Sequence, residues 1–294
     1  MKTLKFLITL VFISLNISVS SQNREVKIEV TKITEQFYML KGQGGNIGLF
    51  IGEDAIFMID DQFAPLTPKI LEAIKKITPQ KVDYLINTHW HGDHTGGNEN
   101  MAKEGALIVA HENVRKRMSK ESTRRGRKIP ASPKEALPVI TFDKDVTFHI
   151  NGDDILATHI HNAHTDGDAL VYFANNNVLH TGDSYFQTGF PYIDLTSGGS
   201  IDGYISGIEK MIMLVDDETK IVPGHGTVSS KKDLEEYLVM LRTLKNRVEA
   251  EIKKGKTLEE VKKNTNITKG YESKSWWITS ERIRETIFRS LNKQ

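Results

Sequence analysis

Residues 88–94, with the sequence THWHGDH, place three histidines and one aspartate directly after a short apolar run. His89 and His91 are two positions apart, so at the end of a strand their side chains leave on the same side. The glycine that follows permits a tight turn, after which Asp93 and His94 can face the same cavity. Imidazole nitrogens and carboxylate oxygens are ligands that zinc accepts in proteins. The stretch therefore predicts a metal site rather than a polar turn with hydrogen-bonded histidines.

Three further residues of ligand type each follow a predicted strand downstream. They are His164 in NAHTDGD, Asp183 in LHTGDSYF and His225 in IVPGHGT. Each of them alone is more typical of a turn or cap residue than of a metal ligand. Together they supply a third nitrogen for one ion and additional ligands for a second.

The chain of 294 residues contains no cysteine, which excludes disulfides and thiolate ligands. Any metal must therefore be held by nitrogen and oxygen. Lysine and arginine number 39 against 38 acidic residues, so the net charge indicates neither a nucleic-acid nor a membrane partner. We expect a small-molecule substrate, and nothing in the sequence sets the oligomeric state.

Residues 1–22 have the pattern of a secretory signal peptide. Lys2 and Lys5 precede an apolar run, Phe6–Leu15, and small residues follow before a plausible cleavage site near Ser20–Gln22. The run is too short to span a bilayer comfortably. A buried N-terminal helix is the alternative. We expect a periplasmic or secreted protein whose mature part, residues 23–294, is one domain that ends in helices.

Strands are predicted where apolar residues alternate or run continuously between turn residues. One group leads into residues 88–94, and a second group follows a segment, 119–138, that is expected to be irregular. The predicted strands are Val26–Val30, Phe37–Lys41, Ile47–Ile51, Ala55–Asp60, Val82–Ile86, Ala106–Ala110, Val146–Ile150, Ile155–His161, Ala169–Ala174, Val178–His180 and Ile221–Val222.

Helices are predicted between and after these strands. Thr67 is expected to N-cap the first, with Pro68 at its first position. Later helices are indicated by capping boxes at Ser230 with Asp233 and at Thr257 with Glu260, and a last helix is expected at Ser280–Leu291. Two runs of strands, each accompanied by helices, predict an α/β architecture of two packed sheets with helices outside.

The motif set His-x-His-x-Asp-His, followed by HTDGD, TGD and PGH, resembles the metallo-β-lactamase fold superfamily of hydrolases. The resemblance extends over roughly residues 25–230, and the four motifs together are specific for the superfamily but not for a substrate. It implies an α/β (α+β) fold, namely a four-layer αβ/βα sandwich with the metal site at one edge of the two packed β-sheets.

The resemblance also implies a ligand set for two Zn²⁺ ions per chain. The first ion is expected on three histidines and the second on one aspartate and two histidines, with Asp183 bridging both. The ligands are His89, His91 and His164 for the first ion, and Asp93, His94 and His225 for the second. Asp60 or Asp61 is the candidate partner for fixing an imidazole of this set.

The implied activity is zinc-dependent hydrolysis, in which a water-derived nucleophile held by the ions attacks a carbonyl of a small ester, lactone or cyclic amide. Asp93 is expected to orient the nucleophile and move its proton. Zinc β-lactamases usually carry Cys or Ser where this chain has Asp183, and many carry Lys where it has Phe186, which puts efficient β-lactam hydrolysis in doubt. The rivals are a dimetal phosphodiesterase or nuclease, a non-hydrolytic iron redox enzyme, and a zinc-stabilised binding protein.

Other features have two interpretations. The basic run 115–128 is either a lid that attracts anions or, as we favour, a solvated loop. The glycine-rich stretches 42–46 and 196–200 are either flaps over the site or turns. For the remaining aromatic residues and histidines we favour packing over function. Tyr185, Tyr192 and Trp90 are candidate pocket walls, Trp276 and Trp277 are assigned to packing, and His111, His149, His159, His161 and His180 are assigned structural roles.

Overall fold

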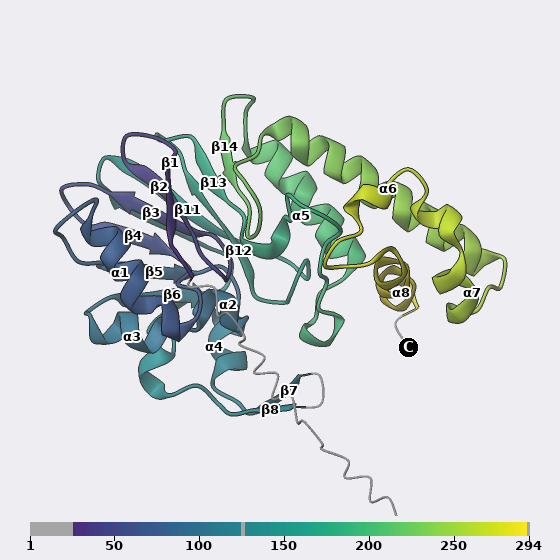
Figure 1. Ribbon diagram of the computed structural model, residues 1–294, viewed down its shortest axis with the longest axis horizontal. Helices are drawn as coiled ribbons and strands as arrows, with labels where there is room; N and C mark the ends of the chain where they lie inside the picture. Colours follow the sequence, from purple (N-terminus) through teal and green to yellow (C-terminus); the bar gives the residue numbers. More distant parts are fainter. Residues whose placement is uncertain (1–25, 125–126, 293–294) are drawn as a thin grey trace, which may run out of the picture.

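Two β-sheets pack face to face, and helices lie on their outer sides (Figure 1). The structure is a computed structural model that describes residues 26–124 and 127–292. The predicted signal peptide, residues 1–22, and the predicted domain start at residue 23 lie outside the described residues.

The first sheet has seven strands in the order β1-β2-β3-β4-β5-β6-β9. Strands β1 to β4 form an antiparallel meander, whereas β4, β5, β6 and β9 are parallel, so the last four end at one edge. The strands are β1 Glu29–Lys32, β2 Phe37–Lys41, β3 Ile47–Ile51, β4 Ile56–Ile59, β5 Tyr84–Asn87, β6 Leu107–His111 and β9 Ile140–Phe142.

The second sheet has five strands in the order β10-β11-β12-β13-β14. It is antiparallel up to β13, and β14 then joins β13 in parallel. The strands are β10 Asp145–Ile150, β11 Asp153–Ile160, β12 Asp168–Phe173, β13 Val178–His180 and β14 Lys220–Val222. A separate hairpin consists of β7 Ser122–Arg124 and β8 Arg127–Ile129.

The space between the sheets is filled by apolar side chains from both inner faces. Phe37 of the first sheet meets Phe173 of the second with ring centroids 4.9 Å apart, and Phe50 meets it at 5.0 Å. Burying each such ring stabilises the fold by roughly 1.5–3 kcal/mol. Ring packing across the sheets therefore fixes how their edges align, and the metal-site residues lie along one of these edges.

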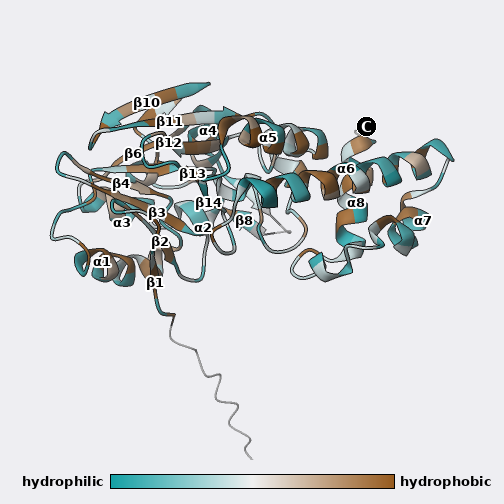
Figure 2. Ribbon diagram, turned by 90° about the horizontal axis from the view of Figure 1, so that it is seen from above, coloured by the Kyte–Doolittle hydropathy of each residue, from teal (hydrophilic) through white to brown (hydrophobic). Residues whose placement is uncertain are grey.

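The outer faces of both sheets are covered by helices. The first sheet packs through Leu49 and Met58 against α1 and α3. The second packs through Leu179 and Ile221 against α5 and α6, and α8 packs on these helices. Figure 2 shows hydrophobic and hydrophilic stretches alternating along α6 and α8. The predicted four-layer αβ/βα sandwich is confirmed. The helices are α1 Thr67–Lys75, α2 Gly92–Thr95, α3 Asn98–Lys103, α4 Glu112–Met118, α5 Ile201–Leu214, α6 Lys231–Lys253, α7 Leu258–Lys263 and α8 Ser280–Leu291.

The two predicted capping boxes are confirmed at the starts of α6 and α7. The expected N-cap at Thr67 is wrong, because a short 3₁₀ turn, Ala64–Leu66, leads directly into α1 and places Leu66 at the cap. Pro68 is in the first turn, as expected. None of the helices in the described part of the chain has both the length and the apolar character needed to span a membrane.

Several elements were not predicted. Strand β9 is short and half exposed, and hairpin β7–β8 lies in the segment expected to be irregular. Helix α5 was missed, and glycines interrupt its sequence, IDGYISGIEKMIML. A Cβ on Gly203 would lie 2.1 Å from the carbonyl oxygen of Asn162, so glycine here permits close packing on the loop after β11.

Candidate metal centre

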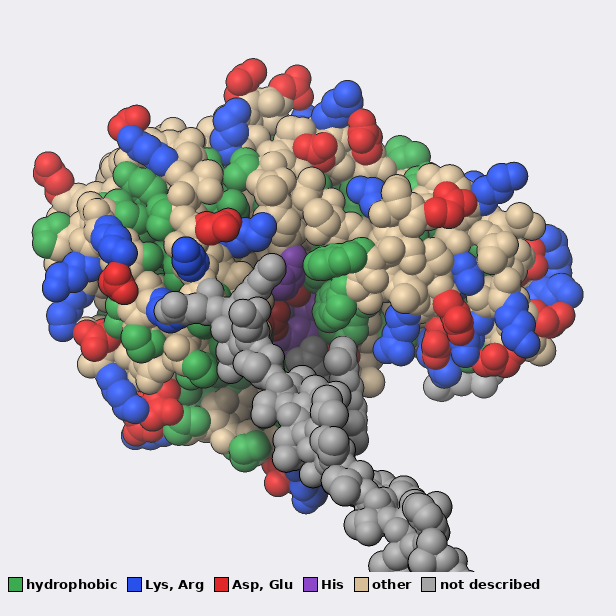
Figure 3. Space-filling model, viewed as in Figure 1, with side chains coloured by type: hydrophobic (Ala, Val, Ile, Leu, Met, Phe, Trp, Pro, Cys, Tyr) green, Lys and Arg blue, Asp and Glu red, His purple; other side chains and the backbone are tan. Residues whose placement is uncertain are grey.

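All seven predicted ligands lie at one edge of the sandwich, each just beyond the end of a strand. His89, His91, Asp93 and His94 follow β5, with the last two on the short helix α2. His164 follows β11, Asp183 follows β13 and His225 follows β14. Figure 3 shows histidine side chains at the bottom of a hollow, with hydrophobic side chains along one wall.

The first half-site consists of His89, His91, His164 and Asp183. One ligand-type atom from each of these side chains lies within 4.8 Å of all the others, and all four side chains are buried. Nε2 of His164 is 2.8 Å from Nδ1 of His91. Such a set of three nitrogens and one oxygen has the composition and spacing of a zinc site.

The second half-site consists of Asp93, His94 and His225 and meets the same 4.8 Å criterion. Oδ2 of Asp93 lies 3.4 Å from Nε2 of His225 and 3.7 Å from Nε2 of His94. Asp93 and His225 are partly exposed, whereas His94 is buried. The second half-site is therefore the one that opens toward solvent.

Asp183 lies between the two half-sites and presents one carboxylate oxygen to each. Oδ1 is 3.2 Å from Nε2 of His94 and 3.4 Å from Nε2 of His225. Oδ2 is 3.5 Å from Nε2 of His164 and 3.8 Å from Nε2 of His89. A carboxylate in this position can ligate two cations at once.

Outer partners fix the tautomer of four of the imidazoles. His94 Nδ1 donates to Asp60 Oδ2 at 2.8 Å, and His91 Nε2 donates to Asp194 Oδ2 at 3.0 Å. His164 Nδ1 donates to the carbonyl of Tyr192 at 2.6 Å. The fourth, His89, contacts the hydroxyl of Thr88 through Nδ1 at 3.1 Å, and that hydroxyl itself donates to Asp60. In each ring the other nitrogen faces the site and can ligate a metal when the imidazole is neutral.

The facing atoms fit bound cations and little else. Nε2 of His89, Nε2 of His94 and Oδ1 of Asp183 are buried and have no hydrogen-bond partner. Leaving such atoms unpaired costs roughly 1–3 kcal/mol each. Divalent cations would satisfy all of them, and the nitrogen and oxygen donors match the preferences of zinc.

The electrostatics favour a neutral His89 and ionised carboxylates, whereas His94 is held in its protonated form. Burial would lower the pKa of His94, but Asp183, Asp60 and Asp93 outweigh it and raise the pKa well above its ordinary value, so a metal ion would displace a proton from this ring. Burial, reinforced by the neighbouring histidines, holds the pKa of His89 well below its ordinary value, so this ring is neutral. Burial alone would raise the pKa of Asp183, but nearby His94 and His225 outweigh it and hold the pKa well below its usual range. Asp93 has a depressed pKa because His94 and His225 likewise outweigh its burial. Both carboxylates are therefore ionised at neutral pH.

Of the two acidic candidates for imidazole support, Asp60 has the required geometry. Besides His94, it accepts the backbone N–H of Thr88 at 2.8 Å through Oδ1. Its φ of 59° is in the left-handed region, which a non-glycine residue adopts at a cost of order 1 kcal/mol. The carboxylate of Asp61 instead accepts the N–H of Gly97 at 2.9 Å and, among the described contacts, makes no hydrogen bond to a ligand imidazole.

Asp194 is the support residue that the sequence did not reveal. It lies 103 positions after His91 and is held by Thr196 and Ser197 of the glycine-rich stretch 196–200. In the sequence, Asp-Leu-Thr-Ser indicates only a local cap. The other glycine-rich stretch, 42–46, also lies at the site, because a Cβ on Gly45 would be 2.2 Å from Cε1 of His94.

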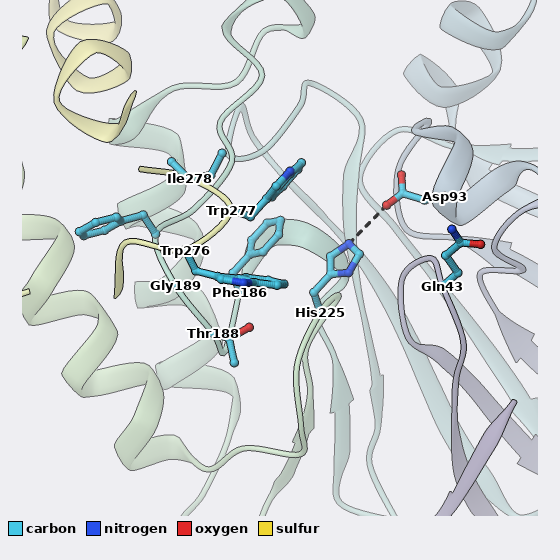
Figure 4. A pocket seen from close by; sticks show the side chains of 10 residues that line it. Gln43, Asp93, Phe186, Thr188, Gly189, His225, Trp276, Trp277 and Ile278 are labelled. Atoms are coloured by element: carbon cyan, nitrogen blue, oxygen red, sulfur yellow. Dashed lines mark ion pairs between the residues drawn. The ribbon is translucent and has the colours of Figure 1, made fainter. Parts of the chain in front are cut away.

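The interpretation of Trp276 and Trp277 as packing residues is wrong. They are 73% and 52% exposed, and they line a cavity of about 240 Å³ with Asp93, His225 and Phe186. In Figure 4, both tryptophans and Phe186 lie on one side of His225, and Asp93 and Gln43 lie on the other. Nothing in the local sequence indicates this, because the two tryptophans lie far from every metal motif in the chain.

The other candidates have structural contacts. Tyr185 is buried and bonds Ser229, whereas Tyr192 lies against the rings of His91 and His164. Trp90 packs beneath Arg117. The remaining histidines lie outside both half-sites: His111, His149, His159, His161 and His180.

The basic run 115–128 includes much of α4 and hairpin β7–β8, and several of its charges are paired. Arg117 forms a two-pronged ion pair with Asp166, and Lys116 and Lys128 bind Glu112 and Glu121. Residues 125–126 lie outside the described part of the chain. The favoured interpretation of the run as a solvated loop is therefore wrong in its secondary structure, because the run is divided between a helix and a hairpin.

Comparison with known proteins identifies the family. The model of the metallo-beta-lactamase superfamily matches residues 40–225, which is more than half of the chain and includes all seven residues of the two half-sites. The chain belongs to the metallo-beta-lactamase superfamily.

Two curated relatives illustrate the sequence similarity. A hydroxyacylglutathione hydrolase of Pelagibacter ubique is 27% identical over 48% of this chain and 51% of its own length. A beta-lactamase-like protein 2 homolog of Caenorhabditis elegans is 25% identical over 67% of this chain and 61% of its own. The chain thus spans little more than half the length of these relatives.

Solved structures share the fold. A metallo-beta-lactamase from Pontibacter korlensis superposes with a TM-score of 0.62 at 20% identity, covering 74% of this chain and 99% of that one. The stereoselective inverting sec-alkylsulfatase Pisa1 from a Pseudomonas species superposes with a TM-score of 0.69 at 15% identity, covering 89% of this chain and 50% of that one. At these identities the likeness establishes the fold alone.

Proposed function

We propose that this chain is an exported dizinc hydrolase that cleaves the bond between the carbonyl carbon and the leaving oxygen, sulfur or nitrogen of a small ester, lactone, thioester or cyclic amide. The observation that carries the proposal is the position of Asp183, which presents one oxygen to each of two half-sites built from histidine and aspartate. Bound zinc ions in such an arrangement supply polarisation of the substrate carbonyl and activation of water.

In this proposal the ligands are divided by half-site. His89, His91 and His164 hold the first ion, Asp93, His94 and His225 hold the second, and Asp183 bridges them. The outer partners Asp60 and Asp194 fix the orientation of the imidazoles, so that little rearrangement is needed when the ions bind.

Asp93 is the proposed catalytic residue. Its side chain is 29% exposed, against 4% for Asp183, and it lines the cavity at the mouth of the site. As an ionised carboxylate it can accept a hydrogen bond from an attacking water and orient that water toward the substrate.

The substrate class rests on two observations. The position where many zinc β-lactamases carry a lysine for the substrate carboxylate is Phe186, which is buried and stacks on His225. The similarity to a second hydroxyacylglutathione hydrolase, of Nitrosococcus oceani, 25% identical over 66% of that protein, supports including a thioester. Export is proposed from the signal-like residues 1–22 alone.

The test is a hydrolysis panel with the purified full chain and added zinc. It covers a cephalosporin, an acyl-homoserine lactone, a thioester and a phosphodiester. The proposal expects turnover of at least one carbonyl substrate and two zinc ions per chain by elemental analysis. Turnover of the phosphodiester alone, or two iron ions instead of zinc, would contradict it.

A pair of variants locates the activity. Asp183→Ala removes the bridging carboxylate and is expected to abolish turnover and lower the metal content. His149→Ala changes an exposed histidine that pairs with Asp154 on the second sheet and is expected to leave both unchanged. Full activity of Asp183→Ala would refute the bridging assignment. For export, the N-terminus of the protein recovered outside the cytoplasm should begin near residue 23.

A further inference from the structure

A wall of aromatic rings closes one side of the metal centre. Phe186 stacks on the ring of His225 with centroids 5.4 Å apart, and Trp277 stacks on Phe186 at 6.2 Å. Trp277 also lies 5.4 Å from Tyr192, which in turn lies against His164 of the first half-site at 5.5 Å. Trp277 therefore joins aromatic residues that contact both half-sites.

The tryptophans are held in place by loop contacts rather than by burial. The backbone N–H of Phe190 donates to the carbonyl of Lys274, which ties their segment to the loop after β13. Ile278 beside them is buried, and Ser275 receives the N–H of Ser280 at the start of α8. The segment follows residues 40–225, so both tryptophans lie outside the range that the family model matches.

Exposure of two adjacent indoles beside a site requires a reason. A large apolar side chain that packs in a core is covered, whereas Trp276 is 73% exposed and Trp277 is 52% exposed. Such surfaces mark places where another molecule is bound. The rings line the same cavity as Asp93 and His225, so a small molecule that fills the cavity also reaches the proposed catalytic carboxylate.

The size and charge of the cavity define what it can hold. Its volume is about 240 Å³, and an apolar cavity of about 150 Å³ already accommodates benzene. The residues that line it include no lysine or arginine; Lys41 and Lys274 line the adjoining polar groove instead. A neutral group of one substituted ring or a short branched chain matches this cavity better than a carboxylate or phosphate does.

We propose that the Trp276–Trp277 pocket binds a neutral apolar substituent of the substrate, next to the scissile carbonyl, and thereby sets the substrate preference. This inference rests on the proposed hydrolase function and extends it to a substrate class, carbonyl compounds with an aryl or aliphatic side group. Contact with the two indoles excludes water from the apolar group, and it places the carbonyl over the two half-sites.

The experiment compares two substrates that differ only in this substituent. Within whichever class the hydrolysis panel identifies, a phenylacetyl compound is measured against its acetyl counterpart with the zinc-loaded full chain. We expect kcat/KM to be roughly tenfold or more higher for the phenylacetyl compound. Trp276→Ala/Trp277→Ala should lower kcat/KM much more for the phenylacetyl compound than for the acetyl compound, so that the ratio of the two values falls to near one.

Two matched variants separate recognition from folding. Trp277→Phe keeps an aromatic ring and should retain most of the preference. Val239→Ala shortens a side chain that is 58% exposed on α6, and it should leave kcat/KM unchanged for both substrates. Equal kcat/KM for the two substrates with the unaltered chain, or an equal loss for both in the double variant, would overturn the proposal.

A binding measurement keeps this proposal distinct from the hydrolase function. Saturation-transfer NMR with phenylacetamide, an unreactive probe, should show contact with the unaltered chain and none with the double variant, whereas acetamide should show none with either. If phenylacetamide bound but no substrate of the panel were hydrolysed, the hydrolase function would be refuted and the proposed binding pocket would still be supported. Absence of phenylacetamide binding, or dissociation of an oligomer in the double variant, would refute the pocket.

Discussion

Oδ2 of Asp194 lies 3.0 Å from Nε2 of His91, although 103 positions of chain separate the two residues. The contact fixes the tautomer of His91 and turns Nδ1 of this ring toward His164. Asp194 is itself held by the hydroxyls of Thr196 and Ser197, so the imidazole is oriented by a rigid turn.

Asp194→Ala should weaken zinc binding at the first half-site by roughly 10–100-fold, because outer partners of a ligand histidine have effects of this size. Competition with a chromophoric chelator measures the affinity directly. Asp154→Ala, which removes an exposed carboxylate, is the matched control. An unchanged affinity in Asp194→Ala would show that the turn holds His91 without the carboxylate.

Asp60 combines an electrostatic role with an unusual backbone conformation, and two substitutions separate them. Asp60→Asn keeps a side chain that tolerates its φ of 59° but removes the charge beside His94, so zinc affinity should fall roughly 10–100-fold with little loss of stability. Asp60→Ala should show the same metal defect and lose about 1 kcal/mol or more of additional stability. Chelator competition and urea unfolding distinguish the two effects.

Gly203 is a helix residue for which the usual propensity rule should reverse. In an exposed helix Gly→Ala stabilises by about 1 kcal/mol. Here a Cβ would lie 2.1 Å from the carbonyl oxygen of Asn162, so Gly203→Ala should destabilise the fold by roughly 1–3 kcal/mol. Ser206→Ala, on an exposed position of the same helix, is the control and should be neutral or slightly stabilising. If Gly203→Ala instead stabilised the protein in urea unfolding, the loop after β11 would have to move and make room for the added Cβ.

His159 should make the fold sensitive to acid. Burial, together with the neighbouring ring of His111, lowers the pKa of His159 from 6.5 to about 4. Between these values the unfolded chain binds more protons than the folded chain, so stability is lost as the pH falls through this window. His159→Gln should flatten the decline by about 1 kcal/mol per pH unit. Urea unfolding of the unaltered protein and of His159→Gln at several pH values in this window measures the effect. The same dependence of the unfolding free energy on pH in both proteins would contradict the prediction.

The ligand residues could be predicted because local sequence carries their signal. A buried strand that ends in THWHGDH places four ligand-type side chains at one edge by chain geometry alone, and the fold class follows from the order of strands and helices. The structure brings the three distant residues His164, Asp183 and His225 to that edge.

Features that depend on contacts between distant segments could not be predicted. In the sequence, Asp194 has only the features of a turn residue. Its support of His91 is evident only once the loop after β13 is placed beside that histidine. Trp276 and Trp277 were assigned to packing because large aromatic side chains are usually covered, and the sequence gives no information about which neighbours cover these two. Helix α5 was missed because Gly203 lowers helix propensity, whereas the close approach to Asn162 that requires this glycine is tertiary.

The division of the ligands between the sheets has a mechanical consequence. His89, His91, Asp93 and His94 belong to the first sheet, and His164, Asp183 and His225 belong to the second, so each half-site takes ligands from both. An ion in either half-site would fasten the two halves of the sandwich together. In a chain without a single cysteine, two metal ions would thus supply cross-links between distant segments, a role that disulfides fill in other proteins.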